Sequence, residues 1–344
     1  MTSRKSKSTR AEKDLSVEEQ QQKISEVRKL IEPLPVGWQN FCSDASISRF
    51  LRARNWNAEK AGKMLSNTLK WRLEYRPEKI CWEDVAHEAE TGKIYRADYL
   101  DKFGRTVLVM RPGFQNTSSA KGQIKYLVYC MENAILHLPP DQEQMVWLID
   151  FQGWTMASVS VKVTRETAHV LQDYYPERLA YGILYNPPKI FESFWKVVKP
   201  FLEHKTYKKV KFVYSDNIES QKIMVDLFEM DKLESAFGGR NPNGFNFQRF
   251  VERMKEDDEK KTDLTSSCGT AHNQLESSVQ LRPTSLSDAE SEDSSYTSSS
   301  GSASPKPGGD EKLENNRKGK MACKSNVSSE AEIHIDAIQV KESG

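Results

Sequence analysis

Histidine and cysteine, the side chains that most often bind zinc or act in nucleophilic catalysis, are few and scattered in this chain of 344 residues. No two histidines stand four residues apart, and no two cysteines have C-x-x-C spacing. The histidines are His87, His137, His169, His204, His272 and His334, and the cysteines are Cys42, Cys81, Cys130, Cys268 and Cys323. This pattern predicts free thiols in a reducing compartment and no metal site.

Motifs of the large enzyme families are also missing. The chain has no G-x-S-x-G, G-x-x-x-x-G-K-[ST], G-x-G-x-x-G or H-E-x-x-H sequence. Asp150, which ends an apolar run, could act as a catalytic carboxylate, but a cap on the end of a strand is the simpler interpretation. No basic stripe interleaved with aromatic residues suggests a nucleic-acid partner. We therefore predict a binding protein without catalytic residues, cofactor or bound nucleic acid.

Charge and aromatic residues divide the chain near residue 255. Residues 256–344 hold 10 basic and 17 acidic residues, a net charge of −7, whereas the preceding residues hold 40 and 32, a net charge of +8. Of the 33 aromatic residues, only Tyr296 lies beyond residue 255. Residues 256–344 are rich in serine and cannot offset the entropy of folding. We expect this acidic tail and the basic residues 1–15 to be disordered.

Residues 16–80 are predicted to be helical. Ser16 and Glu19 form a capping box for a first helix, which Pro33 stops. Two further helices are expected over 44–54 and 57–75.

Residues 81–255 show a different pattern, in which short apolar runs alternate with longer amphipathic segments. This alternation predicts an α/β fold with a largely parallel sheet and flanking helices. The strands are expected at Arg105–Met110, Gln144–Asp150, Leu179–Tyr185 and Lys208–Tyr214, and the helices at 118–137, 157–174, 190–202 and Ile218–Phe228. The longest apolar run, of about seven residues, is far short of the roughly 20 that cross a bilayer.

Periodicity does not explain three segments: Asp173-Tyr-Tyr-Pro-Glu-Arg-Leu179, Tyr185-Asn-Pro-Pro188 and Phe201-Leu-Glu-His-Lys-Thr-Tyr-Lys-Lys-Val210. Together they resemble the CRAL-TRIO lipid-binding family, in its branch of phosphatidylinositol transfer proteins. Four further segments agree in order and spacing: Arg49-Phe-Leu-Arg-Ala-Arg54, Asp101-Lys-Phe-Gly-Arg105, Asp150-Phe-Gln-Gly153 and Phe237-Gly-Gly239. The resemblance covers roughly residues 20–250.

The resemblance implies a hydrophobic pocket, with a sheet as its floor and helices as its walls, that holds one phospholipid behind a mobile helix. That gate helix would lie at residues 190–202, where the apolar stripe consists of Phe191, Phe194, Trp195, Val198 and Leu202. Pro200 is expected to disrupt its last turn. Composition alone favours an ordinary amphipathic helix on the core, and it is the position in the family that favours a gate.

The resemblance also implies a headgroup site at Arg54, Glu177, Thr206 and Lys209. Arg54 and Lys209 would neutralise the phosphate, Glu177 would accept hydrogen bonds from inositol hydroxyls, and Thr206 would supply a hydroxyl. Without the family, a structural Glu177–Lys209 ion pair and a solvated Arg54 explain the same residues.

Members of the family that also carry phosphatidylcholine have hydroxyl side chains on the strand before the Asp-x-x-Gly motif. Met145 and Trp147 occupy those positions here, which argues against phosphatidylcholine as a second ligand.

The expected function is thus binding of phosphatidylinositol and its transfer or presentation between membranes. Two alternatives remain: a carrier of another hydrophobic ligand, such as a sterol or an isoprenoid, and a scaffold that presents lipid to a phosphoinositide kinase. The N-terminal segment lacks the apolar core of a secretory signal. We expect a cytoplasmic monomer that contacts membrane surfaces transiently.

Overall fold

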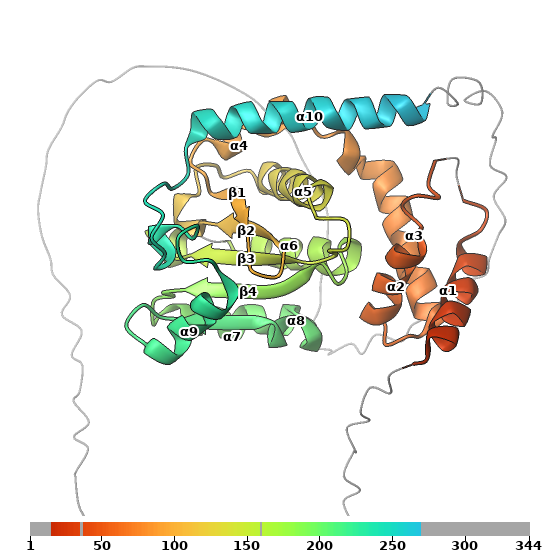
Figure 1. Cartoon of the computed structure of the whole chain (residues 1–344), viewed down its shortest axis with the longest axis horizontal. Helices are drawn as coiled ribbons and strands as arrows, with labels where there is room; N and C mark the ends of the chain where they lie inside the picture. The colour runs from red at the N-terminus through yellow and green to blue at the C-terminus, as the bar shows by residue number, and fades with distance from the viewer. Residues whose placement is uncertain (1–14, 35–36, 159, 270–344) are drawn as a thin grey trace, which may run out of the picture. The chain divides into compact units, whose positions relative to one another are not determined.

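The computed structural model describes residues 15–34, 37–158 and 160–269, so the predicted disordered segments 1–15 and 256–344 lie largely outside the described residues. Ten α-helices and five strands follow one another within these ranges (Figure 1). The helices are α1 (Val17–Ile31), α2 (Asp44–Ala53), α3 (Ala58–Tyr75), α4 (Trp82–Ala89), α5 (Ala120–Leu136), α6 (Val161–Tyr174), α7 (Phe191–Val198), α8 (His204–Lys208), α9 (Ile218–Leu227) and α10 (Phe247–Gly269). The strands are β1 (Ile94–Leu100), β2 (Thr106–Met110), β3 (Met145–Asp150), β4 (Leu179–Tyr185) and β5 (Val210–Val213). Single turns of 3-10 helix are η1 (Pro77–Lys79), η2 (Pro112–Phe114), η3 (Met156–Ser158), η4 (Lys199–Phe201) and η5 (Ser235–Phe237).

Polar caps set the starts of the N-terminal helices. The Ser16 hydroxyl accepts a hydrogen bond from the Glu19 backbone N–H, and the Glu19 carboxylate accepts one from the Ser16 N–H, so the capping box predicted for α1 is present. Ser43 and Asn57 cap α2 and α3 through their side-chain oxygens. The three helices bury a common apolar core that includes Ile24, Val27, Ile47, Leu51 and Leu65.

One five-stranded sheet forms the centre of the C-terminal part, in the order β1-β2-β3-β4-β5. β1 is antiparallel to β2, and the other pairs are parallel. The parallel strands are connected by α5, by α6 and by the pair α7 and α8. Each connection moves one strand further along the sheet and is expected to be right-handed, so these helices lie on the same face. The contacts agree: Arg96 and Thr106 hydrogen-bond to α5, and Ile149 packs on α7. We call this side of the sheet the crossover face.

The opposite face is covered by α9 and the residues that follow it. Tyr95 contacts Phe245, Tyr99 contacts Phe228, and Tyr185 contacts Phe237 through their rings. The expected fold class is therefore confirmed, with N-terminal helices followed by a mostly parallel sheet and flanking helices. Within the described ranges, no helix combines the length and the apolar character needed to cross a bilayer.

The structure adds four elements that the sequence patterns did not predict: β1, α4, α8 and α10. β1 carries Arg96 and Asp98, which conceal its strand character, and Arg96 finds partners in Asn133 and Asp257. α10 also crosses the boundary expected at residue 255, along α4 (Figure 1). The boundary at residue 255 was predicted because few apolar residues follow it. Polar contacts, such as those of Asp257, hold α10 beyond this boundary.

Asp257 is the main polar anchor of α10. Its carboxylate accepts hydrogen bonds from Arg96 Nη2 at 2.7 Å and Asn133 Nδ2 at 3.0 Å, and His137 Nε2 lies 3.0 Å from its other oxygen. Burial raises the pKa of this carboxyl, but the hydrogen bonds and the Arg96 charge outweigh burial and lower the pKa from 3.8 to about 2. A lowered pKa means that the ionised form stabilises the folded state.

Replacement Asp257→Asn should lower the free energy of unfolding by about 2 kcal/mol at neutral pH, since each pKa unit corresponds to about 1.4 kcal/mol. This difference from wild type should be fully present above the ordinary pKa of 3.8 and should vanish as the pH falls through about 2. Urea unfolding of both proteins over this pH range measures it. A difference that does not change with pH would contradict the role of the ionised carboxylate.

Candidate functional site

Three of the four predicted headgroup residues, Glu177, Thr206 and Lys209, line one pocket on the crossover face. Its floor includes Trp147 of β3, and its walls come from α5, α6 and the chain around α8. The full lining is Ala53, Met131, Trp147, Ala168, Leu171, Gln172, Tyr175, Pro176, Glu177, Arg178, Leu179, Leu202, Glu203, Lys205, Thr206 and Lys209. We call it the headgroup pocket.

Glu177 and Lys209 form an ion pair inside this pocket, with Lys209 Nζ 2.9 Å from Glu177 Oε2. Only 15% of the Glu177 side chain and 25% of the Lys209 side chain are exposed. Glu177 has a φ of 56°, a left-handed conformation that is uncommon outside glycine and is often found at functional sites. The Gly182 N–H donates to the Lys209 carbonyl, which ties Lys209 to β4. This ion pair agrees both with a headgroup site and with a purely structural pair, the two interpretations that the sequence left open.

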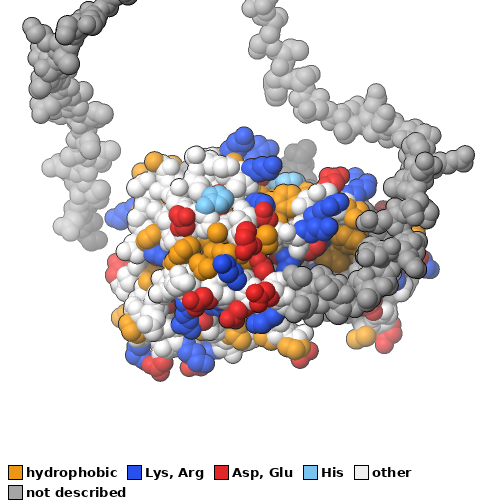
Figure 2. Space-filling view, turned by 90° about the horizontal axis from the view of Figure 1, so that it is seen from above, with side chains coloured by type: hydrophobic (Ala, Val, Ile, Leu, Met, Phe, Trp, Pro, Cys, Tyr) orange, Lys and Arg blue, Asp and Glu red, His pale blue; other side chains and the backbone are white. Residues whose placement is uncertain are grey.

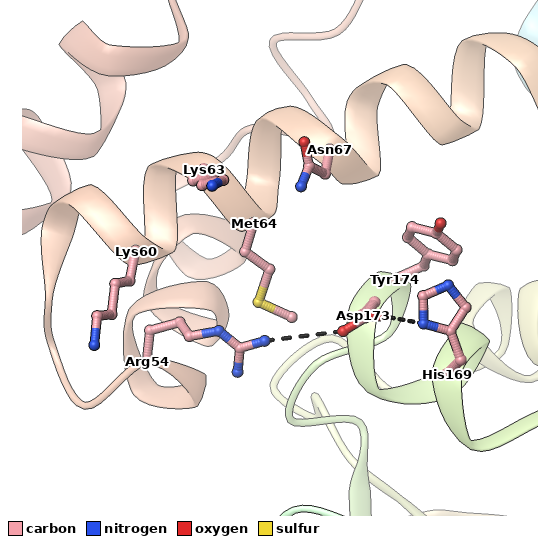
Figure 3. A pocket seen from close by; sticks show the side chains of 8 residues that line it. All are labelled: Arg54, Lys60, Lys63, Met64, Asn67, His169, Asp173 and Tyr174. Carbon is pink, nitrogen blue, oxygen red and sulfur yellow. Dashed lines mark ion pairs between the residues drawn. The ribbon is translucent and has the colours of Figure 1, made fainter. Parts of the chain in front are cut away.

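Arg54 lies outside the headgroup pocket, in a neighbouring groove of about 330 Å³ (Figure 3). Its guanidinium is 3.0 Å from Glu203 Oε1 and 3.9 Å from Asp173 Oδ1, and Asp173 also pairs with His169 Nδ1 at 2.5 Å. Lys60 and Lys63 of α3 line the same groove. The structure therefore does not place Arg54 beside the other three residues, and it shows an ion-paired arginine instead of a solvated helix end.

The segment 201–205, which follows α7 and η4, is held at several points. Gln172 Nε2 donates to the Phe201 carbonyl at 2.8 Å, and Gln172 Oε1 accepts from the Glu203 N–H at 2.6 Å. Lys205 Nζ donates to the Arg52 carbonyl at 3.1 Å. We call residues 201–205 the hinge segment, since it joins α7 to the residues that carry Thr206 and Lys209.

Sequence reasoning missed Gln172 and Arg178 as pocket residues. Gln172 directly precedes the segment Asp173–Leu179 that carried the resemblance, and Arg178 lies within it, but their contacts join parts of the chain far apart in sequence. Arg178 donates to the Glu143 carbonyl at 3.0 Å. Burial lowers the pKa of Arg178 to about 10, so it stays charged at neutral pH.

Charged residues of both signs line the headgroup pocket. Among the described lining residues, Arg178, Lys205 and Lys209 are cations, and Glu177 and Glu203 are anions. Glu177 pairs with Lys209, and Glu203 pairs with Arg54 outside the pocket. A carboxylate or a phosphodiester is the kind of group that cations in a partly buried site stabilise.

The volume of the headgroup pocket is about 80 Å³. Two or three waters occupy about that volume, whereas pockets for small ligands measure about 300–1,000 Å³. A lipid headgroup therefore needs this pocket to widen, and at least one wall must move.

α7 packs against the part of the crossover face that lies beside the headgroup pocket. Phe191, Phe194 and Val198 are buried, and Trp195 and Leu202 are half-buried. The α-helix ends at Val198, before Pro200, as predicted. The apolar cluster under α7 consists of Phe151, Trp154, Leu184, Phe191, Phe194 and Val198, with Ile149, Trp195, Val210 and Phe212 packed around it.

This packing is that of an amphipathic helix on a core, which was the interpretation from composition alone. Phe191 lies 4.5 Å from Phe151 and 5.5 Å from Trp154 between ring centroids, and Phe194 lies 5.9 Å from Trp154. The aromatic side chains of α7 thus occupy the apolar face of the sheet themselves. A gate role stays a prediction, and we call this arrangement, with α7 packed on the sheet, the closed structure.

Metal ligands do not cluster in the described part of the chain, where no group of three or more His, Cys, Asp and Glu side chains could hold an ion.

Two family models match the sequence. The model described as "CRAL/TRIO domain" matches residues 89–239, and that described as "CRAL/TRIO, N-terminal domain" matches residues 18–67. A CRAL-TRIO domain-containing protein of Schizosaccharomyces pombe is 34% identical over 56% of this chain and 18% of its own length. The phosphatidylinositol transfer protein PDR17 of Saccharomyces cerevisiae is 32% identical over 59% of this chain and 59% of its own. These matches span less than two thirds of either relative.

The fold also matches a solved structure. The crystal structure of Sfh5 aligns with a TM-score of 0.56 at 17% sequence identity, over 74% of this chain and 99% of that one. At this identity the match concerns the fold alone.

Replacement Phe194→Ala should loosen α7 selectively. The deletion removes a buried aromatic ring, which typically costs about 3–5 kcal/mol. If α7 opens as a local unit, amide hydrogen exchange should accelerate in α7 and little in α5. The control is Val197→Ala, an exposed position on the same helix. Equal acceleration in α5 and α7 would show that α7 is part of the global core and is no gate.

Proposed function

Because the chain belongs to the CRAL-TRIO family, we propose that it binds one molecule of phosphatidylinositol on the crossover face and transfers it between membranes without chemical change. The name of PDR17, a phosphatidylinositol transfer protein, supports this ligand class. The proposal includes a cytoplasmic location and a transient contact with membranes.

The partly buried ion pair of Lys209 and Glu177, in a pocket that Thr206 also lines, is the observation that carries this proposal. A phosphodiester brings one negative charge, which a partly buried ammonium group stabilises. In the loaded state, Lys209 turns from Glu177 to the phosphate, and Glu177 accepts hydrogen bonds from inositol hydroxyls. Thr206 contributes its hydroxyl from α8. Lys209 and Glu177 then each keep a partner.

Arg54 takes part by releasing the hinge segment. In the closed structure its guanidinium is paired with Glu203, which follows the end of the gate. A phosphate in the widened pocket competes with Glu203 for this arginine, because a phosphodiester, like a carboxylate, carries one negative charge on two oxygens and can bind a guanidinium through both. Loss of the Arg54–Glu203 pair loosens the hinge segment, which then contacts α2 through the Lys205–Arg52 hydrogen bond. Headgroup binding and gate opening are thereby coupled.

The acyl chains take the place of the aromatic side chains of α7. About 30 methylenes at about 0.8 kcal/mol each must be kept out of water, a total of roughly 24 kcal/mol. Ile149, Leu184 and Phe212 present an apolar surface of this kind once α7 moves. Such an opening in water would expose both the sheet and the helix. We propose that α7 opens while it contacts a bilayer.

The outer side of α7 suits such a contact. Ile190 is 57% exposed and Val197 is 49% exposed. Lys189, Lys196 and Lys199 are exposed near them, against Glu192 alone on the same segment. Aliphatic side chains between lysines bind the surface of a membrane that contains anionic lipids.

Replacement Lys209→Ala should abolish loading with phosphatidylinositol, since it removes the cation nearest Glu177. The measurement is transfer of labelled phosphatidylinositol between vesicles by the full chain, with Lys208→Ala as the control because Lys208 is exposed and does not line the pocket. Unchanged transfer by Lys209→Ala would refute the headgroup site.

A second variant separates ligand binding from folding. Lys209→Ala leaves Glu177 without its ion-pair partner, so the double variant Lys209→Ala/Glu177→Gln restores neutrality and should be as stable as wild type while transfer stays lost. If the intact protein itself carries no phosphatidylinositol, the ligand is another hydrophobic molecule such as a sterol or an isoprenoid, and extraction of the purified protein identifies it.

Replacement of Ile190 and Val197 by Glu should weaken binding to vesicles that contain anionic lipid by at least about tenfold, because two aliphatic contacts with the membrane are lost. Co-sedimentation with vesicles measures this loss. Ile218→Glu is the control, since Ile218 is 88% exposed but lies on α9. An equal effect of the control would assign the loss to charge alone.

A further inference from the structure

Trp147 presents a buried hydrogen-bond donor that lacks a partner. Its indole Nε1 is shielded from solvent, and no acceptor among the described residues lies within hydrogen-bond distance of it. Burying an N–H without an acceptor costs free energy, whereas a phenylalanine at this position would fill an apolar floor without that cost. An unpaired donor in a native fold therefore calls for an explanation.

The place of Trp147 in the sheet supplies one. Trp147 lines the headgroup pocket together with Glu177, Thr206 and Lys209. In the sheet register it pairs with Gly182 of β4, and Gly182 pairs with Val210 of β5. Because Gly182 has no side chain, no side chain stands on the sheet between the indole and β5. A Cβ added at Gly182 would lie 3.8 Å from its nearest neighbour, Val210 Cγ2. The indole thus borders the space into which the pocket widens.

Backbone contacts connect the same row to the charged residues. The Gly182 N–H donates to the carbonyl of Lys209 at 3.1 Å, and Lys209 directly precedes β5. The backbones of Trp147 and Lys209 are therefore separated by two strand spacings, or about 10 Å along the floor. Because both side chains line the same pocket, one headgroup can contact both.

We infer that the Trp147 indole N–H donates a hydrogen bond to a headgroup oxygen of the bound phospholipid, and that Trp147 is a ligand-binding residue of the pocket. This inference rests on the proposed function. The acceptor is a phosphodiester or inositol oxygen. A ligand without a polar headgroup leaves the donor unpaired.

The test is Trp147→Phe in the full chain, which removes the N–H and keeps an aromatic ring. Affinity is measured for two probes with the same acyl chains, phosphatidylinositol and diacylglycerol. Loss of one hydrogen bond should weaken phosphatidylinositol by about tenfold and leave diacylglycerol unchanged. The matched control is Trp82→Phe, the same exchange at a buried position on α4 that does not line the pocket.

A second measurement follows the donor itself. The side-chain N–H resonance that is absent from the spectrum of Trp147→Phe belongs to Trp147. In the wild-type protein this resonance should move downfield on loading with phosphatidylinositol and should stay in place with diacylglycerol. A resonance that responds to neither probe, or equal weakening of both probes by Trp147→Phe, would overturn the inference and leave Trp147 with a packing role.

The outcomes also separate this inference from the proposed function. If the wild-type chain binds no phosphatidylinositol, the proposed function fails and the inference fails with it. If wild type binds it and Trp147→Phe binds it equally well, the proposed function stands and the inference alone is wrong.

Discussion

The apolar crossover face of the sheet is the constraint on which the rest of the structure depends. Ile149, Leu184 and Phe212 form a surface that must be covered at all times, since exposed aliphatic and aromatic area of this extent would drive association. In the closed structure the rings of Phe191 and Phe194 cover it. A ligand that replaces these rings has to offer comparable apolar area, and acyl chains do so. Covering this face thus determines the position of α7, and in the proposed function it also sets the class of ligand.

The hinge segment connects that apolar face to the polar pocket. It follows the end of α7 and leads directly into α8, so any movement of the gate also displaces Thr206 and Lys209. Gln172 holds the segment to α6 by two hydrogen bonds, and Arg54 holds it to α2 by an ion pair. These contacts are polar and lie near the surface, which makes each of them weak enough to exchange. In the proposed function, the N-terminal helices therefore take part in gating through the contacts of the hinge segment.

Local patterns predicted those parts of the fold whose stability is local. The strand at Leu179–Tyr185 and the helices that Ser16 and Asn57 cap were expected within a residue or two. β1 and α10 were not, because long-range polar partners such as Arg96 and Asp257 stabilise them, and no periodicity records such a pair. The same holds for the site. Family resemblance grouped Glu177 with Lys209, but it could not reveal that Arg54 pairs with Glu203 across a groove, nor that Gln172 secures the hinge segment.

Polar groups in the pocket follow the same rule as the apolar face, in that each has a partner in either state. Glu177 and Lys209 neutralise each other while the pocket is narrow, which avoids the cost of two partly buried charges without partners. In the proposed loaded state, phosphate and inositol hydroxyls replace these contacts. Trp147 departs from this rule, because its N–H has no partner among the described residues in the closed structure. A donor that gains a partner only on loading stabilises the loaded state over the closed one, and the balance between the two states then depends on the headgroup as well as on the acyl chains.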